Sequence, residues 1–410
     1  MTSIAPQSDT TWSSVPLERV LAEARGRQPG PTLICVGAMH GNEPAGVRAI
    51  QRVEQRLAGS GLIDQGDFVG LLGNRSALIQ GSRFVERDLN RAWTEGRLEA
   101  LTRDGEPPER GEDLEQLELL VEIQRAVDEA RGPVYLLDLH TTSGPGGIFS
   151  VFGDALPHRA FASAFPVPMV LGLEELVEGT LIQFFGERGL VAVTVETGKH
   201  DAPEAVERAE AAIWVALRAL DMLEPAGLEL AVAGERMLRR ASEGLPRALE
   251  MRHRHAVRPQ DGFVMAPGFG NFDRVSRGAV IAHDRAGDIL VPESARLLMP
   301  LYQDQGEDGF FLVRRFSPFW MWVSAHLRNP GAARLASRLP GVNPVPGDPD
   351  AVIVNRRVAR FFARQLFHLL GFRRVEEAGA RIVLRRRPFD RPSTLTGRKR
   401  DKNSGGPAPG

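Results

Sequence analysis

Short apolar segments alternate with amphipathic segments from Thr32 to Met222, and this alternation limits the possible folds more than any other feature of the sequence. Apolar runs typical of buried strands lie at 32–37, 67–72, 133–139, 148–152, 167–171 and 190–195. Pro44 and Pro203 each begin a segment with apolar residues on one helical face. Because strands that alternate with helices form a mostly parallel sheet covered by helices, we expect an α/β fold here.

The pattern changes after Gly227, where short apolar runs are separated by Gly- and Pro-containing turns. This pattern of short apolar runs and turns predicts a smaller β-rich domain. Ser317-Pro318 is typical of a helix start, and a second apolar stripe predicts a helix over 355–370. The predicted organisation, compatible with the 410-residue length, is an N-terminal extension (1–29), an α/β domain (30–226), a β-rich domain (227–316), a C-terminal extension with two helices (317–387) and a disordered tail (388–410).

Composition excludes several classes of function. The 51 basic and 52 acidic residues give a net charge of −1, so no global positive field is present to hold nucleic acid or an anionic membrane. The single cysteine, Cys35, cannot form an internal disulfide or a Cys-rich metal site. The first residues lack a signal-peptide pattern, and no uncharged apolar run reaches the roughly 18 residues of a membrane span. We therefore expect a cytoplasmic protein without nucleic-acid partners.

A candidate metal site follows from histidines placed at two strand ends. His40-Gly-Asn-Glu43 comes directly after the strand 32–37, and His140 ends the strand 133–139. Ligands collect at the carboxyl ends of strands in such sheets, and Zn²⁺ favours nitrogen and oxygen donors with one position left open for water. The alternative is that each histidine caps its strand and hydrogen-bonds to a backbone carbonyl.

Other polar residues are candidates for substrate chemistry. The guanidinium groups of Arg83 and Arg91 are planar and charged, and the amide of Asn90 forms directional hydrogen bonds. Together these groups suit a substrate with a carboxylate and a carbonyl. Glu196 ends an apolar strand, and beside a metal-bound water it would accept and return a proton. The alternatives are a solvated arginine-rich loop and an ordinary acidic residue at a strand end.

Taken together, these elements resemble the succinylglutamate desuccinylase/aspartoacylase family, whose members are relatives of the zinc carboxypeptidases. The resemblance is carried, in order along the chain, by His40-x-x-Glu43, Arg83, Asp88-Leu-Asn90-Arg91, Asp138-Leu-His140 and Glu196. It covers residues 30–225 and extends more loosely to Phe316. It implies a zinc carboxypeptidase-like fold with a mixed, mostly parallel sheet. In the predicted organisation the β-rich domain and the C-terminal helical extension follow this fold, and the resemblance implies nothing about the extension.

The resemblance also implies a role for each matching residue. His40, Glu43 and His140 would bind one Zn²⁺ per chain. Arg83 would polarise the scissile carbonyl, Asn90 and Arg91 would hold a substrate carboxylate, and Glu196 would act as general base and then acid. Arg188 and Tyr302 are candidate counterparts of a further arginine and a second-domain tyrosine. Asp138, two residues before His140 on its strand, would either orient a ligand imidazole or be a solvated acid.

The expected function is that of a zinc-dependent amidohydrolase that removes the acyl group from an N-acyl amino acid or a related small amide. Two alternatives stay open: a carboxypeptidase-like hydrolase acting on peptides or cell-wall fragments, and a catalytically inactive binding protein. The expected partner is a small-molecule N-acyl substrate, and a homo-oligomer is compatible with the sequence.

Overall fold

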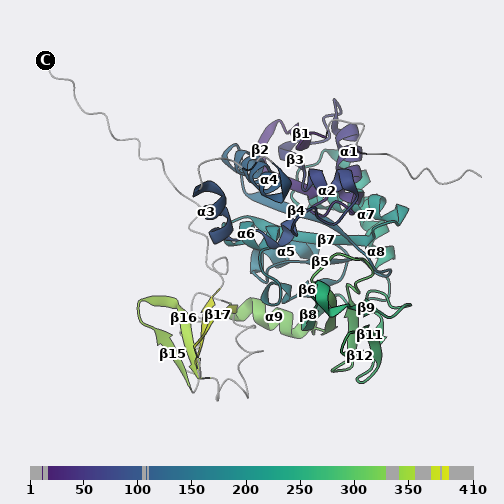
Figure 1. Cartoon of the computed structure of the whole chain (residues 1–410). Coiled ribbons are helices and arrows are strands. Elements are labelled where there is room, and N and C mark those ends of the chain that lie inside the picture. Colours follow the sequence, from purple (N-terminus) through teal and green to yellow (C-terminus); the bar gives the residue numbers. More distant parts are fainter. Residues whose placement is uncertain are drawn as a thin grey trace, which may run out of the picture. The chain divides into compact units, whose positions relative to one another are not determined.

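The chain consists of two compact units, Met1–Met321 and Trp322–Gly410. The computed structural model describes residues 12, 17–103, 108, 110–328, 341–355, 371–378 and 381–386 (Figure 1). The first unit contains all the predicted site residues. Its organisation therefore determines what the site can do.

An 11-stranded sheet runs through the first unit. Its strands, in spatial order, are β1 (Val20–Arg25), β3 (Gln65–Leu72), β2 (Gln28–Gly37), β4 (Val134–Thr142), β7 (Val191–Lys199), β5 (Phe149–Val151), β6 (Met169–Leu171), β8 (Ala248–Ala256), β14 (Asp308–Arg315), β13 (Ala295–Leu298) and β10 (Arg274–Val275). From β3 to β8 every neighbouring pair is parallel except β7–β5, whereas the pairs from β8 to β10 are antiparallel. This confirms the predicted mixed, mostly parallel sheet.

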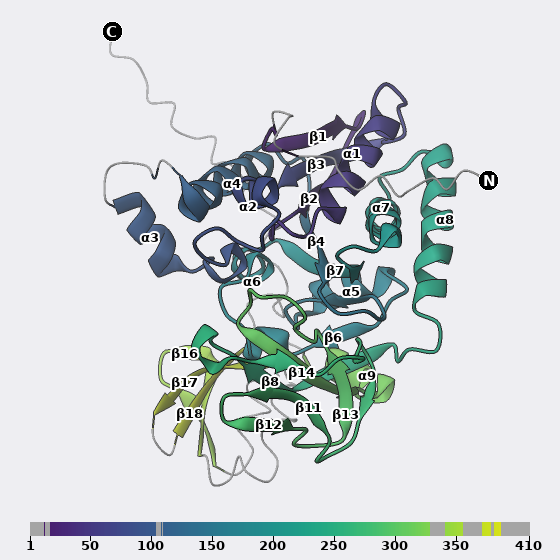
Figure 2. The same ribbon diagram turned by 45° about the vertical axis from the view of Figure 1, so that its right-hand side comes forward.

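Helices cover both faces of this sheet, as the alternation of the sequence predicts. One core contains buried residues of α1 (Ala45–Leu57), α5 (Leu156–Ala164), α7 (Pro203–Ala219) and α8 (Pro225–Ala241). The other contains residues of α4 (Gly111–Asp128) and α6 (Leu181–Glu187). Successive residues of β4 alternate between the two cores, Leu136 in the second and Leu137 in the first, because strand side chains point to opposite faces. Figure 2 shows α7 and α8 on one side of the sheet and α4 on the other.

The β-rich segment differs from expectation at its start. Residues from Leu228 onward were expected to form short strands, but Pro225–Ala241 is the helix α8. Its buried residues Gly227, Ala231, Gly234 and Leu238 recur at helical spacing, and small side chains let α8 pack closely on α7. Further on, β9 (Val264–Met265), β11 (Val280–Asp284) and β12 (Gly287–Leu290) form a separate three-stranded sheet, while the other strands extend the main sheet.

The predicted N-terminal extension also contributes to the main sheet. Residues Val20–Arg25 form β1, which pairs antiparallel with β3 at the sheet edge. Residues 1–29 are therefore not wholly separate from the α/β domain. Three shorter helices, α2 (Arg75–Gln80), η2 (Leu89–Arg91) and α3 (Glu95–Arg103), lie in the connection between β3 and α4.

The described part of the C-terminal region contains strands that were not expected. The helix α9 (Pro318–Leu327) begins at the predicted Ser317-Pro318 start. Four strands follow, β15 (Val342–Val345), β16 (Asp348–Asn355), β18 (Arg381–Arg386) and β17 (Phe372–Ala378), which pair antiparallel in that order. Short β-branched runs such as Ala351–Val354 form these strands. The helix expected after Asn355 and the tail 388–410 lie outside the described residues.

Within the described part of the chain, no helix combines the length and the apolar character needed to cross a membrane.

Candidate metal centre and active site

Three potential metal ligands meet at the carboxyl ends of β2 and β4. His40 and Glu43 lie in the turn between β2 and α1, and His140 lies near the end of β4. His40 Nδ1 is 2.8 Å from Glu43 Oε1, and His140 Nδ1 is 3.1 Å from Glu43 Oε2. One donor atom from each residue lies within 4.8 Å of the others, and all three side chains are buried. The structure thus brings together the three residues that the sequence singled out as ligands.

The turn that carries His40 and Glu43 is closely packed. A Cβ atom on Gly41 would lie 2.0 Å from the backbone carbon of Ala77 in α2, so no side chain fits at that position. Ala38, just after β2, has a φ of 56°, which turns the chain sharply toward His40. Close contact with α2 therefore fixes the direction in which His40 and Glu43 leave the sheet.

Each imidazole has a carboxylate on its other ring nitrogen. His40 Nε2 is 3.1 Å from Asp88 Oδ1, and His140 Nε2 is 2.8 Å from Asp138 Oδ2. Such contacts orient metal-binding imidazoles and fix their tautomers. Asp138 is fully buried, so of the two roles expected for it the structure supports the orienting one. The matching role of Asp88 was missed, although its position in the Asp88-Leu-Asn90-Arg91 run was a signal.

The local charges favour a cation at this position. Burial opposes ionisation of Glu43, yet the two imidazoles hold the pKa of its carboxyl well below the usual range. Burial also opposes protonation of His140, yet Asp138 and Glu43 hold its pKa well above the usual range. Three buried carboxylates around two imidazoles thus stabilise positive charge between them. This donor set of two nitrogens and one carboxylate fits Zn²⁺ with an open position.

Arg83 reaches the edge of this cluster from the loop before η2. Its Nε and Nη2 donate to Asp88 Oδ2 at 3.1 and 2.9 Å, and its Nη1 lies 3.7 Å from Glu43 Oε1. Burial opposes ionisation of Asp88, but Arg83 and His40 hold the pKa of its carboxyl well below the usual range. Asp88 therefore stays ionised and connects Arg83 to His40.

The loop of residues 83–88 is held in place by Glu112, a buried residue in the first turn of α4. Its carboxylate accepts backbone N–H groups of Val85 at 2.6 Å, Glu86 at 2.9 Å and Arg87 at 3.3 Å. It also accepts a hydrogen bond from Asn74 Nδ2 at 3.1 Å. All four partners are donors, so an ionised carboxylate is the side chain that satisfies them. Nothing in the sequence indicated this role.

Glu196 lies next to the metal ligands on the neighbouring strand. β4 and β7 pair His140 directly with Glu196. Glu196 Oε2 is buried and accepts no hydrogen bond from the described residues. Burial raises the pKa of Glu196 to about 8; Glu43 and Asp138 add to this rise, while His140 opposes it. A carboxyl group with a free oxygen and a pKa near neutrality suits proton transfer.

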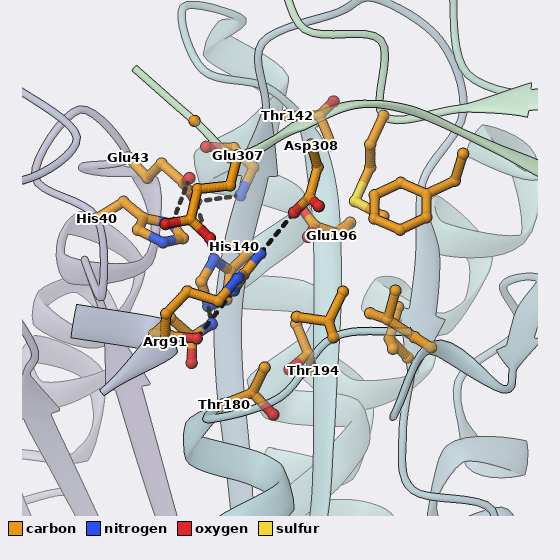
Figure 3. Close-up of a pocket in the computed structure, with 18 of the residues that line it drawn as sticks. His40, Glu43, Arg91, His140, Thr142, Thr180, Thr194, Glu196, Glu307 and Asp308 are labelled. Carbon is orange, nitrogen blue, oxygen red and sulfur yellow. Dashed lines mark hydrogen bonds and ion pairs between the residues drawn. The ribbon is translucent and has the colours of Figure 1, made fainter. Parts of the chain in front are cut away.

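A cavity opens onto these groups, and most of the predicted site residues line it. Figure 3 shows His40, Glu43, His140 and Glu196 around it, with Arg91 linked to Asp308. Arg83, Asn90 and His200 line it as well. Asn90 Oδ1 accepts the backbone N–H of Leu181 at 2.9 Å, and Arg91 Nη2 donates to Asp308 Oδ2 at 2.7 Å.

Two predicted substrate-binding residues do not line the cavity. Arg188 pairs with Glu95 at 3.1 Å, and its guanidinium lies 3.4 Å from the centre of the Phe184 ring. The Tyr302 hydroxyl donates to the backbone oxygen of Ala266 at 2.7 Å within the β-rich segment. These partners hold both side chains away from the cavity, which corrects their expected placement there.

Instead, the β-rich segment reaches the site through the loop of residues 299–307. Gln303 Oε1 accepts from Asn42 Nδ2 at 2.7 Å and lies 3.1 Å from His200 Nε2. Gln305 Oε1 accepts the Arg83 N–H at 3.0 Å, and its Nε2 donates to the Phe84 carbonyl at 3.1 Å. Sequence analysis missed both glutamines, because their partners lie more than 100 residues away and no local pattern marks them.

Comparisons with known proteins agree with this geometry. The family profile of the succinylglutamate desuccinylase/aspartoacylase catalytic domain matches residues 29–221. The chain is 27% identical to a succinylglutamate desuccinylase of Pseudomonas aeruginosa over 286 residues, which are 67% of this chain and 81% of the relative. It is 36% identical to a Pseudomonas paraeruginosa succinylglutamate desuccinylase over 91 residues, or 22% of this chain, and that match spans only 26% of the relative's length.

Solved structures show the same fold. A succinylglutamate desuccinylase/aspartoacylase from Rhodobacter sphaeroides superposes with a TM-score of 0.54 at 17% identity, covering 73% of this chain and 88% of the other. The product-bound ectoine utilization protein EutE (DoeB) from Ruegeria pomeroyi superposes with a TM-score of 0.50 at 18% identity, covering 71% and 86%. With the profile match and the order of the site residues, the conclusion is that residues 29–221 form a catalytic domain of the succinylglutamate desuccinylase/aspartoacylase family.

Proposed function

We propose that this protein is a zinc-dependent amidohydrolase that hydrolyses the amide bond of an N-acyl amino acid or a related small amide. The observation that carries the proposal is the pairing of Glu196 on β7 with His140 on β4, beside His40 and Glu43. His40, Glu43 and His140 would hold Zn²⁺. When bound, the ion lowers the pKa of water to about 7 and polarises a carbonyl group.

Glu196 is the proposed general base and acid. Glu196 lines the cavity and its Oε2 has no hydrogen-bond partner among the described residues, so it would take a proton from the attacking water and return it to the leaving amine. The low-dielectric surroundings that raise its pKa also make the protonated form accessible, which the second transfer needs.

Arg83 is the proposed donor to the oxygen that becomes negatively charged during attack. Asp88 holds two of its nitrogens, which leaves Nη1 on the side of Glu43. Loss of one such preorganised donor costs about 3 kcal/mol of transition-state stabilisation. The Asn90 side chain holds the start of α6 through the backbone N–H of Leu181. Arg91 is proposed to bind a single substrate carboxylate, which takes the place of Asp308 as its partner.

A small substrate is favoured over a polymer by the loop of residues 299–307. Gln303 ties this loop to Asn42 and Gln305 ties it to Arg83, so it lies along the cavity rather than leaving an open groove.

The test uses the purified full chain and its Glu196→Gln variant. The wild type is expected to contain about one zinc per chain and to hydrolyse members of a panel of N-acyl amino acids. Glu196→Gln should keep its zinc and lose at least about 100-fold in kcat/KM, because proton transfer contributes about that much or more. Elemental analysis and amine release are the measurements.

Glu178→Gln, at an exposed position, serves as the matched control and should behave as wild type. Full activity in Glu196→Gln would remove the proposed base. Activity on short peptides, with none on N-acyl amino acids, would replace the proposed substrate class.

A further inference from the structure

One wall of the cavity is apolar. Six of its residues, from five different segments, are Val151, Phe152, Val177, Ile182, Met299 and Phe311. All but Met299 are buried, so their side chains are held in place by the surrounding core. Figure 3 shows apolar side chains grouped on the side of Glu196 that faces away from His40. This wall is therefore a preformed surface for an apolar substituent next to the reacting groups.

Charges in the cavity are unfavourable for additional carboxylates. Among the described residues that line it, five are acidic and two are arginines. Glu43 and Glu196 are assigned to the metal and to proton transfer, which leaves Glu174, Glu307 and Asp308 against Arg83 and Arg91. Arg83 is paired with Asp88, and Arg91 with Asp308, which also accepts from Arg254 Nε at 2.5 Å. Burial lowers the pKa of His200, which disfavours a positive charge on this histidine. The cavity can therefore bind one ligand carboxylate, which would replace Asp308 as the partner of Arg91.

This balance does not suit a substrate with several carboxylates. The Pseudomonas relatives are named for succinylglutamate, an amide that carries three carboxylates. A second or third carboxylate here would lie against apolar side chains or beside Glu307 and Asp308, and an unpaired charge in such surroundings is costly.

We propose that the substrate of this enzyme has a single carboxylate and an apolar aliphatic or aromatic substituent that packs on this wall. The inference rests on the proposed amidohydrolase function and narrows its substrate class. The substituent belongs to either the acyl group or the amino-acid side chain, and the experiment separates these two sources.

The experiment compares four isosteric substrates with the zinc-loaded full chain. The acyl group is 4-methylpentanoyl or succinyl, and the amino acid is leucine or aspartate; within each pair an isopropyl group replaces a carboxylate of nearly the same shape. N-(4-methylpentanoyl)leucine is expected to have a kcat/KM at least about 100-fold above that of N-succinylaspartate, because the latter places two additional charges in the cavity. If kcat/KM falls only when succinyl replaces 4-methylpentanoyl, the wall binds the acyl group. If kcat/KM falls only when aspartate replaces leucine, the wall binds the amino-acid side chain.

A second readout is independent of turnover. Calorimetric binding of the same four compounds to zinc-loaded Glu196→Gln should follow the same order of affinity. Tightest binding or fastest hydrolysis of N-succinylaspartate would overturn the inference. If no compound is hydrolysed while the binding order holds, the proposed reaction fails and the ligand class stands.

A charge introduced into the wall tests its position. In the substrate pair that the first experiment assigns to the wall, Met299→Arg should raise the ratio of kcat/KM for the carboxylate member over the isopropyl member at least about tenfold, since a cation there would pair with the added carboxylate. Met237→Arg, the same change at an exposed position of α8, should leave the ratio unchanged. An unchanged ratio in Met299→Arg would overturn the placement of the substituent at this wall.

Discussion

The two walls of the cavity differ in how their residues are held. The metal ligands and Glu196 lie at the ends of neighbouring strands, where backbone pairing sets their separation. The apolar wall takes Val151 and Phe311 from strands of the same sheet, but Met299 comes from the loop of residues 299–307, and side-chain contacts between distant parts of the chain hold this loop. The comparison indicates that the reaction is specified by sheet register, and the choice of substrate in part by long-range loop packing.

The largest effect on kcat/KM is expected from a substitution at Glu112. This residue supports the wall formed by the metal ligands and Glu196, called the reactive wall here, without lining the cavity. Glu112→Gln replaces one acceptor oxygen with a donor, so the backbone of residues 85–87 loses part of its support and Arg83 shifts. We expect kcat/KM to fall about 10- to 100-fold, as for other residues that orient catalytic groups, mainly through kcat.

Zinc content should not change, which distinguishes repositioning of Arg83 from loss of the metal. Glu122→Gln, on the same helix with its carboxylate paired to Arg125, is the control. A wild-type kcat in Glu112→Gln would show that the loop of residues 83–88 is held by other contacts.

A smaller effect is expected from Gln305, which joins the two walls. Gln305→Ala removes hydrogen bonds to the backbone of residues 83 and 84, each worth about 1 kcal/mol. We expect kcat/KM to fall about tenfold, mostly through a higher KM, because the loop samples open positions. Steady-state kinetics provide the measurement.

Gln65→Ala removes a comparable side-chain hydrogen bond, to Asp221, away from the site and should leave kinetics unchanged. An effect of Gln305→Ala on kcat alone would mean that the loop acts on Arg83 rather than on substrate binding.

The smallest effect on activity is expected from Glu115, a buried acid that supports α2 and therefore the packing behind His40. Burial opposes its ionisation, but Arg19, Ser76 and Arg75 lower its pKa. Because the folded-state pKa lies below the unfolded one, the stabilisation is present above about pH 4.3 and is lost as the pH falls through the folded-state pKa.

Glu115→Gln should therefore lower the free energy of unfolding by about 3 kcal/mol at pH 7, and the difference from wild type should shrink below about pH 4. Urea unfolding at several pH values measures this. Glu118→Gln, whose carboxylate is partly exposed, should show a much smaller difference. A difference that does not depend on pH would assign the effect to packing instead of charge.

Sequence reasoning indicated which residues of the reactive wall lie close together, because its signals are local. The strand runs ending near His40, His140 and Glu196 placed these side chains at one sheet edge, and the stripe Val47, Ile50 and Val53 predicted α1. These features depend on periodicity and strand order, which nearby residues specify.

The rest depends on contacts that no local pattern encodes. Gln303 and Gln305 have ordinary surroundings in the sequence, and Tyr302, directly before Gln303, turns the other way to bond with Ala266. The start of α8 was missed because the turn residues up to Gly227, a poor helix former, were given more weight than the helical spacing of the buried residues that follow.

The pairing of His140 with Glu196 has a consequence for how such a protein changes over time. Both residues are fixed by the ladder between two central strands, so insertions or substitutions in the surrounding connections leave the distance between ligand and base unaltered. New specificities can then arise by remodelling the outer connections alone, with the hydrolytic apparatus inherited intact.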